Sequence, residues 1–427
     1  MPVILQINVT ANSGSTGRIA EQINQLAQNN GWETYIAYGR SNQPCKSKLI
    51  HTSNKFQVYE HYAEHRLFDN DGLASRVATR QLVNQIREIK PDIIHLHNIH
   101  DHWLNYQILF EYLNTLDIPV VWTQHDCWSF TGGCPYFSMR NCYRWRDGGC
   151  TQGCPMKKHR IIEKTKRHYQ LKHDLFTATK KLTLVPVSRW LEEIVRQSFF
   201  KCHNIVTIQN GVDVSAFYPT YSIEVRQKYG IGTGWYVIGI ASQWSVRKGF
   251  DDYLQLSSII SKEVKIVMVG LNADQAKKAR LHGIVSIPRT QNVGELAALY
   301  SGAMMTLNLS REETFGLTTV EGYACGTPGV VYNATASPEL VLDSPKTLEQ
   351  INTGEPLYVG ETGWIVGQGD VEAVAKVISD WMGAIAKDPD LEVKMRKECR
   401  ERAEREFNKD NKFADYLNLY NELLAKK

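Results

Sequence analysis

Residues 308–328 read NLSREETFGLTTVEGYACGTP, and the rest of the chain is organised around this stretch. The apolar run at 304–307 just before it is typical of a short buried strand. A Phe-Gly pair then interrupts the chain before residues 317–324 take up helical spacing. A strand, a glycine turn and a helix place Glu313 on a loop at the carboxyl edge of a sheet, with Glu321 in the helix that follows.

The start of this helix favours a bound anion. The amides of Gly316, Leu317 and Thr318 have no acceptors within the helix, and the helix dipole adds positive potential at the same point. Two carboxylates beside a phosphate would repel it unless they accept hydrogen bonds from neutral hydroxyls. A nucleotide sugar offers a phosphate and hydroxyls together, so Glu313 and Glu321 are candidates to hold sugars. The alternative is an ordinary strand-to-helix turn with two surface carboxylates.

The composition limits the class of protein. A chain of 427 residues is longer than one hydrophobic core usually supports, which favours two or three domains. A net charge of +4 is too small to indicate a nucleic-acid partner. The sequence shows no basic leader and no uninterrupted apolar run of about 18 residues. We therefore expect a cytoplasmic protein without a secretion signal or a membrane span.

The loop at 13–18 is a second candidate phosphate contact. Gly14 and Gly17 let the backbone approach a ligand closely, and the helix expected at 19–27 supplies free amides. A purely structural glycine turn is the alternative.

Three histidines lie on or just past expected strands of the first half. His95 and His97 share one face of the strand at 92–97, where they either bind a metal or line a cleft. His125 follows the strand that begins at Val120, at the edge where an α/β sheet binds its ligands. His125 is therefore a candidate for the active site, and a satisfied structural histidine is the alternative.

Four cysteines in the segment 127–154 have the spacing Cys-x7-Cys-x7-Cys-x3-Cys: Cys134, Cys142, Cys150 and Cys154. Four thiolates can close a structural zinc site, and the last pair has a known ligand spacing. Three states remain open for these residues: structural zinc, reduced buried thiols and disulfides.

A strongly basic helix is expected at 155–181, with apolar residues at roughly helical spacing on its other face. The cationic face would contact anionic lipid head groups or a lipid-diphosphate acceptor, and a solvated surface helix is the alternative. The cations are Lys157, Lys158, Arg160, Lys164, Lys166, Arg167, Lys172, Lys180 and Lys181.

The alternation of strands and helices restarts after the sharp turn at 210–213, which indicates a second doubly wound domain. Lys248 lies on the loop after the first strand of this half, and its charge suits a departing diphosphate. The neighbouring Arg247 is a second cation for the same oxygens.

The order of these motifs resembles the retaining GT-B glycosyltransferases of family four, whose signature is a Glu-x7-Glu pair with Phe-Gly inside it. Glu313 and Glu321 match that pair, and His125, the Asn-Gly-Val-Asp turn and the Lys-Gly at 248–249 follow in the family's order. Gln243 stands where the family commonly has an arginine. Cysteine-rich inserts of this kind are similar to those of bacterial capsule and colanic-acid transferases.

The resemblance implies an α/β fold of the GT-B type, with two doubly wound Rossmann-like domains. Residues 1–208 would form the acceptor-side domain, 209–405 the nucleotide-sugar domain, and 406–427 a terminal helix that packs back on the first.

The resemblance also implies roles for single residues. Glu313 would contact the transferred sugar, Glu321 the ribose and His125 the sugar again, with Lys248 completing the catalytic set. The donor-binding residues would be Gly14, Gly17, Arg247, Arg289, Phe315, Gly316, Leu317, Thr318 and Glu321. No cofactor would be needed for catalysis.

The resulting hypothesis is a retaining transferase that moves a hexose from a UDP or GDP sugar to a glycan or polyprenyl-diphosphate-linked acceptor. It would work in surface polysaccharide biosynthesis at the inner face of the cell membrane, without a nucleic-acid partner. The alternative is a zinc-bearing protein that binds sugar nucleotides without turnover.

Overall fold

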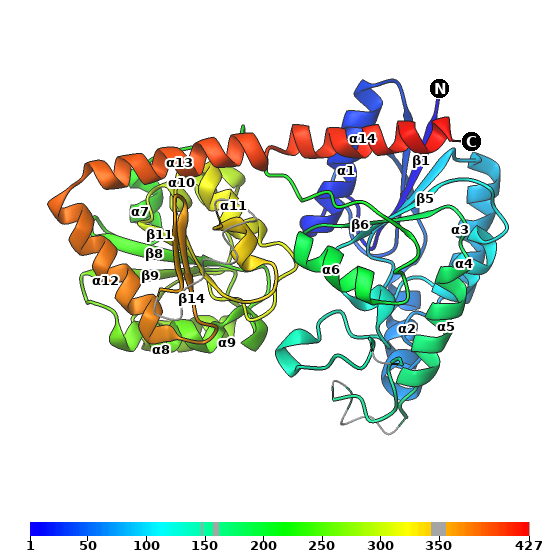
Figure 1. Cartoon of the computed structure of the whole chain (residues 1–427), viewed down its shortest axis with the longest axis horizontal. Coiled ribbons are helices and arrows are strands. Elements are labelled where there is room, and N and C mark those ends of the chain that lie inside the picture. Colours follow the sequence, from blue (N-terminus) through cyan, green and yellow to red (C-terminus); the bar gives the residue numbers. More distant parts are fainter. Residues whose placement is uncertain (147, 156, 158–161, 343–355, 427) are drawn as a thin grey trace. The chain divides into compact units, whose positions relative to one another are not determined.

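The computed structural model describes residues 1–146, 148–155, 157, 162–342 and 356–426, and the chain divides into two compact units. The first unit contains Met1–Gln209 and returns at Lys412, and the second is Asn210–Asn411. Each unit is built around a seven-stranded sheet that helices cover (Figure 1). The predicted α/β fold with two doubly wound domains is therefore confirmed.

The sheet of the first unit is parallel throughout, with the order β3-β2-β1-β4-β5-β6-β7. Its central strands are apolar and buried, as a parallel sheet between helices requires. The strands are β1 (Val3–Ile7), β2 (Glu33–Tyr38), β3 (Lys48–His51), β4 (Ile93–Leu96), β5 (Val120–Gln124), β6 (Leu182–Pro186) and β7 (Asn204–Ile205). The helices are α1 (Gly14–Asn29), α2 (Lys55–Phe68), α3 (Arg76–Ile89), α4 (Tyr106–Leu113), α5 (Thr165–Thr177), α6 (Arg189–Gln197) and α14 (Lys409–Ala425).

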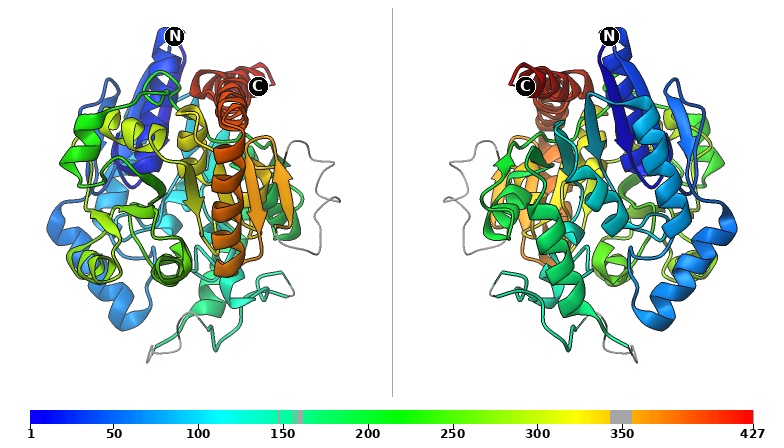
Figure 2. Two further views of the ribbon diagram at one scale, coloured as in Figure 1. Left: turned by 90° about the vertical axis from the view of Figure 1, so that its left-hand side faces the viewer. Right: turned by 90° about the vertical axis from the view of Figure 1, so that its right-hand side faces the viewer.

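The sheet of the second unit has the order β10-β9-β8-β11-β12-β14-β13, and its edge strand β13 is antiparallel. The strands are β8 (Trp235–Ile240), β9 (Val264–Val269), β10 (Val285–Ile287), β11 (Met305–Asn308), β12 (Gly329–Tyr332), β13 (Tyr358–Gly360) and β14 (Gly363–Val366). The helices are α7 (Ile223–Lys228), α8 (Phe250–Ile259), α9 (Ala273–Leu281), α10 (Val293–Ser301), α11 (Leu317–Ala324), α12 (Val371–Lys387) and α13 (Asp390–Glu406). Helix α12 packs against β14 and α8 and runs alongside the strands of this sheet (Figure 2).

In both sheets the direction of winding reverses beside the first strand, between β1 and β4 and between β8 and β11. In such a sheet the ligand crevice lies at the carboxyl ends of the strands on either side of this switch point. The segments that leave this edge are 8–17, 97–105 and 125–135 in the first unit, and 241–249 and 309–316 in the second. These segments carry most of the predicted site residues.

Helix α1 begins earlier than the sequence predicts. Its N-cap is Ser13 and its first residue is Gly14, so residues 14–18 form the first helical turn rather than a loop. Gly17 is buried in that turn, and a Cβ added there would lie 2.6 Å from Thr10 Oγ1. Gly17 therefore allows close packing of the helix, while Gly14 stays exposed at the helix start.

The basic helix expected at 155–181 is shorter and less cationic on its surface than predicted. Helix α5 covers only its second half, and Lys158 and Arg160 lie outside the described residues. Lys172 is fully buried, donates a hydrogen bond to the carbonyl of Trp128 at 2.7 Å and lies 3.3 Å from the centroid of that indole. Burial lowers its pKa to about 7, against the effect of nearby acidic groups.

Lys157 is also an internal group, because it forms an ion pair with the buried Asp69 at 2.9 Å. Lys164 donates to Asn70 Oδ1 at 2.8 Å. These contacts fasten the insert to the turn after α2. Lys166 and Arg167 remain exposed.

The terminal helix α14 begins at Lys409 and packs in the first unit from Lys412 onwards. Phe413, Tyr416 and Tyr420 are buried there.

Candidate active site

Lys248 and Glu313 meet at the switch point of the second sheet. Lys248 ends a short 3-10 turn after β8, and Glu313 lies on the loop after the adjacent strand β11. The Lys248 ammonium pairs with the Glu313 carboxylate, and the two side chains are 22% and 13% exposed. Burial raises the pKa of Glu313, but the Lys248 ammonium lowers it by a larger amount. The pKa therefore lies below its usual value, and the carboxylate is ionised.

Backbone hydrogen bonds fix the loop that carries Glu313. Its amide donates to Thr335 Oγ1 at 2.8 Å, and the Thr335 hydroxyl donates to the Glu313 carbonyl at 2.6 Å. Arg247 Nη1 donates to the carbonyl of Glu312 at 2.9 Å, and the Arg247 carbonyl accepts from the Arg311 amide at 2.8 Å. Arg247 therefore joins the loops that carry Lys248 and Glu313.

Gly316 is the N-cap of helix α11 and has a backbone conformation that other residues rarely adopt. Its φ is 102°, and a Cβ would lie 2.9 Å from Leu340 Cδ1 and 3.2 Å from Asn308 Nδ2. No side chain caps the helix start. The first amides, those of Leu317 and Thr318, are therefore positioned to receive an anion.

Glu321 lies one turn into the same helix, where Tyr300 holds it. The phenol donates to Glu321 Oε2 at 2.9 Å. Burial, reinforced by the carboxylate, raises the pKa of Tyr300 well above its usual value, so the phenol keeps its proton. One carboxylate thus follows the helix start and another precedes it.

Two predicted donor-binding side chains lie away from this group. Phe315 is buried with its ring 6.0 Å from that of Phe407, so its side chain packs in the core. Arg289 is exposed on the loop after β10, which is separated from β8 by β9.

In the first unit His125 follows β5 directly and contacts His97. The distance from His97 Nδ1 to His125 Nε2 is 3.0 Å, and the two rings stack. Burial lowers the pKa of His125 to about 4, so its imidazole is neutral near pH 7.

The hydrogen-bond network assigns the tautomer of His125. Gln6 uses its amide nitrogen to donate to Ala20 O and Asn24 Oδ1, so its oxygen faces His97 Nε2 at 2.6 Å and accepts from it. His97 then accepts at Nδ1, and His125 must donate from Nε2. The Nδ1 atom of neutral His125 is therefore a hydrogen-bond acceptor.

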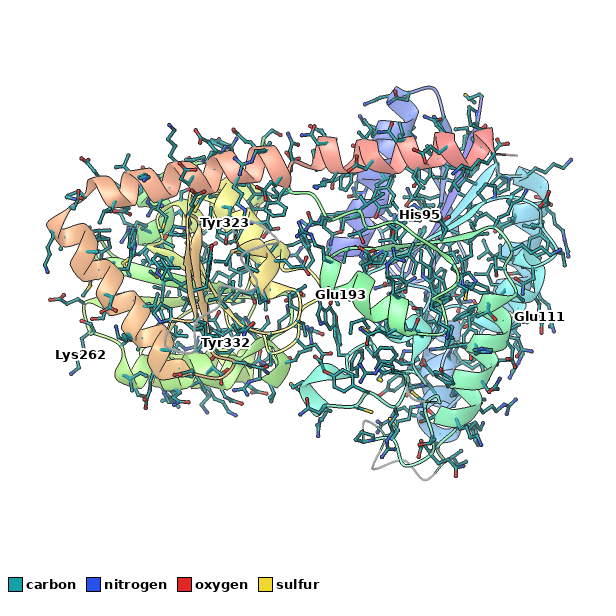
Figure 3. The ribbon with its side chains drawn as sticks, viewed as in Figure 1. His95, Glu111, Glu193, Lys262, Tyr323 and Tyr332 are labelled. Atoms are coloured by element: carbon teal, nitrogen blue, oxygen red, sulfur yellow. The ribbon has the colours of Figure 1, made fainter. Side chains whose placement is uncertain are left out.

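His95 and His97 share one face of β4, as predicted, with ring centroids 4.1 Å apart. The interpretation of His95 as a cleft or metal residue is wrong, because its side chain is fully buried (labelled in Figure 3). Its ring nitrogens bond Tyr420 Oη at 2.6 Å and Thr123 Oγ1 at 2.7 Å. The terminal helix thus covers this histidine.

An ion pair that was not predicted from the sequence lies next to His125. His100 Nε2 lies 2.8 Å from Asp126 Oδ2, and His100 Nδ1 lies 3.3 Å from Asp101 Oδ1. Burial lowers the pKa of His100, but Asp126 and Asp101 raise it well above its usual value, so the imidazolium persists near neutral pH. The aspartate that directly follows His125 could have indicated such a pair. Its partner His100 lies on another loop, so no fixed spacing in the sequence connects the two residues.

The four cysteines of the insert line one small cavity with a volume of about 10 Å³, enough for a single small ion or water. They carry free thiols, so the disulfide alternative does not describe this structure. In the part of the chain that the structure describes, no three of these sulfur atoms all lie within 4.8 Å of one another. Another group of possible metal ligands in the first unit does have this spacing. Burial raises the pKa of Cys134 to about 12 and that of Cys150 to about 11.

Two doubly wound units, each with polar groups at its switch point, are the arrangement of the GT-B glycosyltransferases, and solved glycosyltransferase structures match this fold. The model described as Glycosyltransferase Family 4 matches residues 13–216, and the model described as Glycosyl transferases group 1 matches residues 222–406. Together the two matches cover most of both units. The chain belongs to the family 4 glycosyltransferases.

Curated relatives match part of the chain. The colanic acid biosynthesis glycosyl transferase WcaC of Escherichia coli K12 is 29% identical over 181 residues, 39% of this chain and 43% of WcaC. The N-acetyl-alpha-D-glucosaminyl L-malate synthase of Bacillus anthracis is 24% identical over 230 residues, 52% of this chain and 54% of that protein. The chain thus spans about half the length of these relatives.

Solved structures match the whole fold at low identity. Sucrose-phosphate synthase from Thermosynechococcus elongatus has a TM-score of 0.69 and 16% identity over 100% of both chains. Anabaena HepE in complex with UDP-glucose has a TM-score of 0.63 and 15% identity, covering 97% of this chain and 99% of HepE. At these identities the comparison establishes the fold.

None of the helices that the structure describes combines the length and the apolar character needed to cross a membrane.

Proposed function

We propose that this protein transfers a hexose from a nucleoside-diphosphate sugar to a glycan or lipid-linked glycan acceptor, with retention of the anomeric configuration. The observation that carries the proposal is the Lys248–Glu313 pair beside the uncapped start of α11. A cation, helix amides and two carboxylates form one group that suits a pyrophosphate with a sugar on one side and a ribose on the other. The Anabaena neighbour was solved with UDP-glucose, which supports a nucleotide sugar as the donor.

In the proposed reaction the bond between the anomeric carbon and the β-phosphate oxygen breaks while the acceptor oxygen bonds the same face of the sugar. The acceptor's proton passes to the departing phosphate oxygen, and the nucleoside diphosphate leaves. Lys248 and the amides of Leu317 and Thr318 stabilise the negative charge that develops on the leaving group. Glu313 accepts a hydrogen bond from a sugar hydroxyl, and Glu321, held by Tyr300, accepts from the ribose.

The first unit contributes His125 in this proposal. Its Nδ1 accepts a hydrogen bond from a hydroxyl of the transferred sugar, because Nε2 donates to His97. The charged His100–Asp126 pair next to it holds the segment after β5 in place.

The Glu313→Gln variant tests the assignment. It keeps the shape of the side chain and removes its charge, so we expect turnover to fall at least 100-fold in an assay of nucleoside diphosphate release, while nucleotide binding survives. The exposed Glu263→Gln is the matched control and should turn over normally. Unchanged turnover in Glu313→Gln would remove this carboxylate from the mechanism, and equal losses in both variants would show a general stability effect.

A thermal-shift panel of UDP, GDP and their sugars identifies the donor class. The nucleotide that fits should raise the melting temperature, and its sugar should raise it further. A protein that no nucleoside diphosphate stabilises contradicts the proposal. Stabilisation without turnover on any acceptor favours the non-catalytic alternative.

The lipid-linked acceptor implies contact with an anionic membrane. Lys166 and Arg167 on α5 and the outward-facing Phe56 and Tyr59 on α2 support it, since exposed cations and aromatic side chains bind interfaces. We expect co-sedimentation with liposomes rich in anionic lipid at low salt, lost in 0.5 M salt. No co-sedimentation at low salt contradicts this part of the proposal.

The cysteine cavity supports a structural zinc ion as a separate proposal. Binding would deprotonate the four thiols and draw them together from their present positions around the cavity. Purified protein should then release one equivalent of zinc when a thiol reagent modifies these cysteines. Release of well below one equivalent by the thiol reagent supports reduced buried thiols instead.

A further inference from the structure

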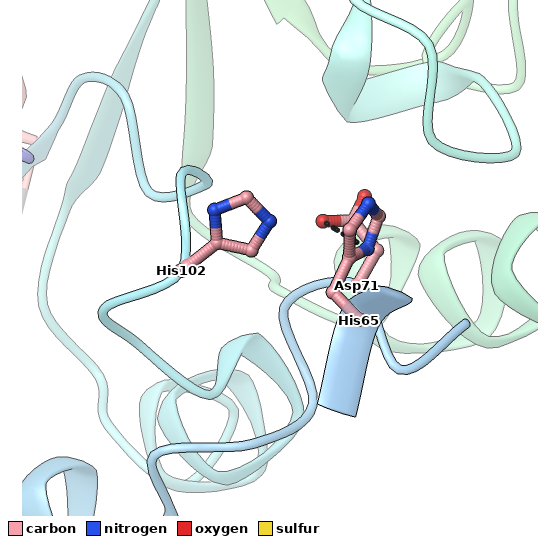
Figure 4. Close-up of side chains that lie close together, drawn as sticks. All are labelled: His65, Asp71 and His102. Carbon is pink, nitrogen blue, oxygen red and sulfur yellow. Dashed lines mark ion pairs between the residues drawn. The ribbon is translucent and has the colours of Figure 1, made fainter. Parts of the chain in front are cut away.

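A group of metal ligands lies in the first unit, apart from the cysteines. His65, Asp71 and His102 each offer one ligand atom, and these atoms lie within 4.8 Å of one another. Figure 4 shows the ring of His102, on the loop after β4, facing the Asp71 carboxylate and the His65 ring from the end of α2 and the turn beyond it.

The carboxylate of Asp71 is already oriented. Its Oδ2 accepts a hydrogen bond from the indole nitrogen of the buried Trp128 at 2.9 Å. Its Oδ1 faces His65 Nδ1 at 3.6 Å, longer than a normal hydrogen bond. Fixing one carboxylate oxygen through an outer hydrogen bond while the other faces the site is the usual arrangement around a bound metal.

His61 supplies an independent observation. It lies four residues before His65, hence on the same face of α2, and its side chain is fully buried. Its Nδ1 contacts Ser75 Oγ at 2.8 Å, while its Nε2 is buried and has no hydrogen-bond partner among the described residues. Its ring lies 5.6 Å from that of His102. His61 lies outside the group whose ligand atoms are within 4.8 Å of one another, so its ring would have to shift to bind the same ion. A buried imidazole nitrogen without a partner is available for such a contact.

Helix α2 has a structural need for such an ion. Of its 14 residues, all of which the structure describes, His61 is the one that is buried. Its large apolar side chains face outward: Phe56, Tyr59, Tyr62, Leu67 and Phe68. Apolar packing therefore contributes little to holding this helix in place, and a metal ion would join it to the loop after β4.

We propose that His65, Asp71 and His102 bind one divalent ion of the zinc type that fastens α2 to the loop after β4, and that the His61 ring shifts toward the ion to become its fourth ligand. Imidazole nitrogens with a single carboxylate favour zinc and similar transition metals over magnesium or calcium, which prefer oxygen ligands. The ion has a positioning role, and the proposed sugar transfer does not depend on it for chemistry.

Zinc binding to chelator-stripped full-length protein tests the proposal. Wild-type protein should bind one equivalent more zinc than the His65→Gln/His102→Asn double variant, measured against a competing chromogenic chelator. Asn suits position 102, because the backbone φ there is 65°. His173→Gln is the matched control, since His173 also pairs with an aspartate but lies on the exposed face of α5. It should bind as much zinc as wild type.

Three further outcomes decide the question. Asp71→Asn, which can still accept from Trp128, should weaken binding at least 10-fold, so the proposal stays testable if the double variant fails to fold. Zinc should raise the melting temperature of wild type more than that of the variants. Cobalt at this site should show ligand-field bands that persist in a Cys150→Ser/Cys154→Ser background. Equal zinc content in wild type and the double variant would overturn the proposal and leave His65 and Asp71 as an ordinary ion pair.

Discussion

Gly249 controls how closely the Lys248 loop approaches the Glu313 loop. Its φ is 71°, and a Cβ there would lie 2.2 Å from the carbonyl oxygen of Leu309, at the start of the Glu313 loop. Gly283 has the same φ of 71° with nothing within 4 Å of an added Cβ. Alanine substitutions at the two glycines therefore separate the energetic cost of the backbone conformation from the cost of the steric clash with Leu309.

Gly283→Ala should lower the free energy of unfolding by about 1–2 kcal/mol, because alanine disfavours the left-handed backbone conformation. The stiffer unfolded chain should offset about 0.4–1 kcal/mol of this loss. Gly249→Ala adds overpacking against backbone, which costs a further 1–3 kcal/mol or so. We therefore expect Gly249→Ala to be about 2–4 kcal/mol less stable than wild type, and Gly283→Ala about 1 kcal/mol.

Urea denaturation measures both losses, and isothermal titration of nucleoside diphosphate measures the consequence for the site. The displaced loop should move Lys248 away from the amides at the start of α11, with which it would bind the pyrophosphate, so Gly249→Ala should bind nucleotide at least several-fold more weakly at a temperature where it is folded. Gly283→Ala should bind normally. Equal stability losses, or normal nucleotide affinity in Gly249→Ala, would refute the reasoning that this contact sets the geometry of the pair.

Tyr300→Phe removes the hydrogen bond to Glu321. A hydrogen bond to a charged group contributes about 1.5–3 kcal/mol, so titration should show nucleotide binding that is roughly 10-fold or more weaker. Acid should destabilise the first unit. His125 takes up its proton near pH 4 when folded and near pH 6.5 when unfolded, so the unfolded state binds more protons in between, and the free energy of unfolding falls as the pH drops through that range. The difference amounts to at most about 3 kcal/mol, and His125→Gln should flatten this part of a calorimetric pH profile. His97→Gln should raise KM for the donor while the protein stays folded, because the substitution disturbs the tautomer of His125. An unchanged KM contradicts the assigned network.

The strand, turn and helix around Glu313 could be predicted because the determinants are local. Apolar runs, the glycine break and helical spacing all lie within about 20 residues, and each acts on its neighbours in the chain. The same logic located β8 and the Lys248 loop. It did not show that Lys248 pairs with Glu313, because this contact depends on β8 and β11 being neighbours in the sheet although 65 residues separate the pair.

Burial by distant segments explains the incorrect predictions. Lys172 has the helical spacing of a surface cation, but the insert after β5 places Trp128 over it. His95 lies at the end of a strand where ligands often bind, but the last helix of the chain covers it with Tyr420. Helix α2 could not be located from the sequence, because its apolar residues face outward and its periodicity does not mark a buried face. The His61-x3-His65 spacing was the signal available.

The pairing of Lys248 with Glu313 couples the two halves of donor recognition. Each charge is partly buried, so each needs a partner, and in the ligand-free chain they serve one another. A pyrophosphate that draws Lys248 away leaves the carboxylate unpaired unless a sugar hydroxyl donates to it. A nucleoside diphosphate alone therefore binds against this cost, whereas the nucleotide sugar satisfies both groups. It follows that Glu313→Gln, whose side chain is neutral, should bind the bare nucleoside diphosphate at least as tightly as wild type and should lose the preference for the sugar-bearing form. Weaker binding of the bare diphosphate by this variant would mean that Glu313 holds Lys248 in its working position instead of competing for it.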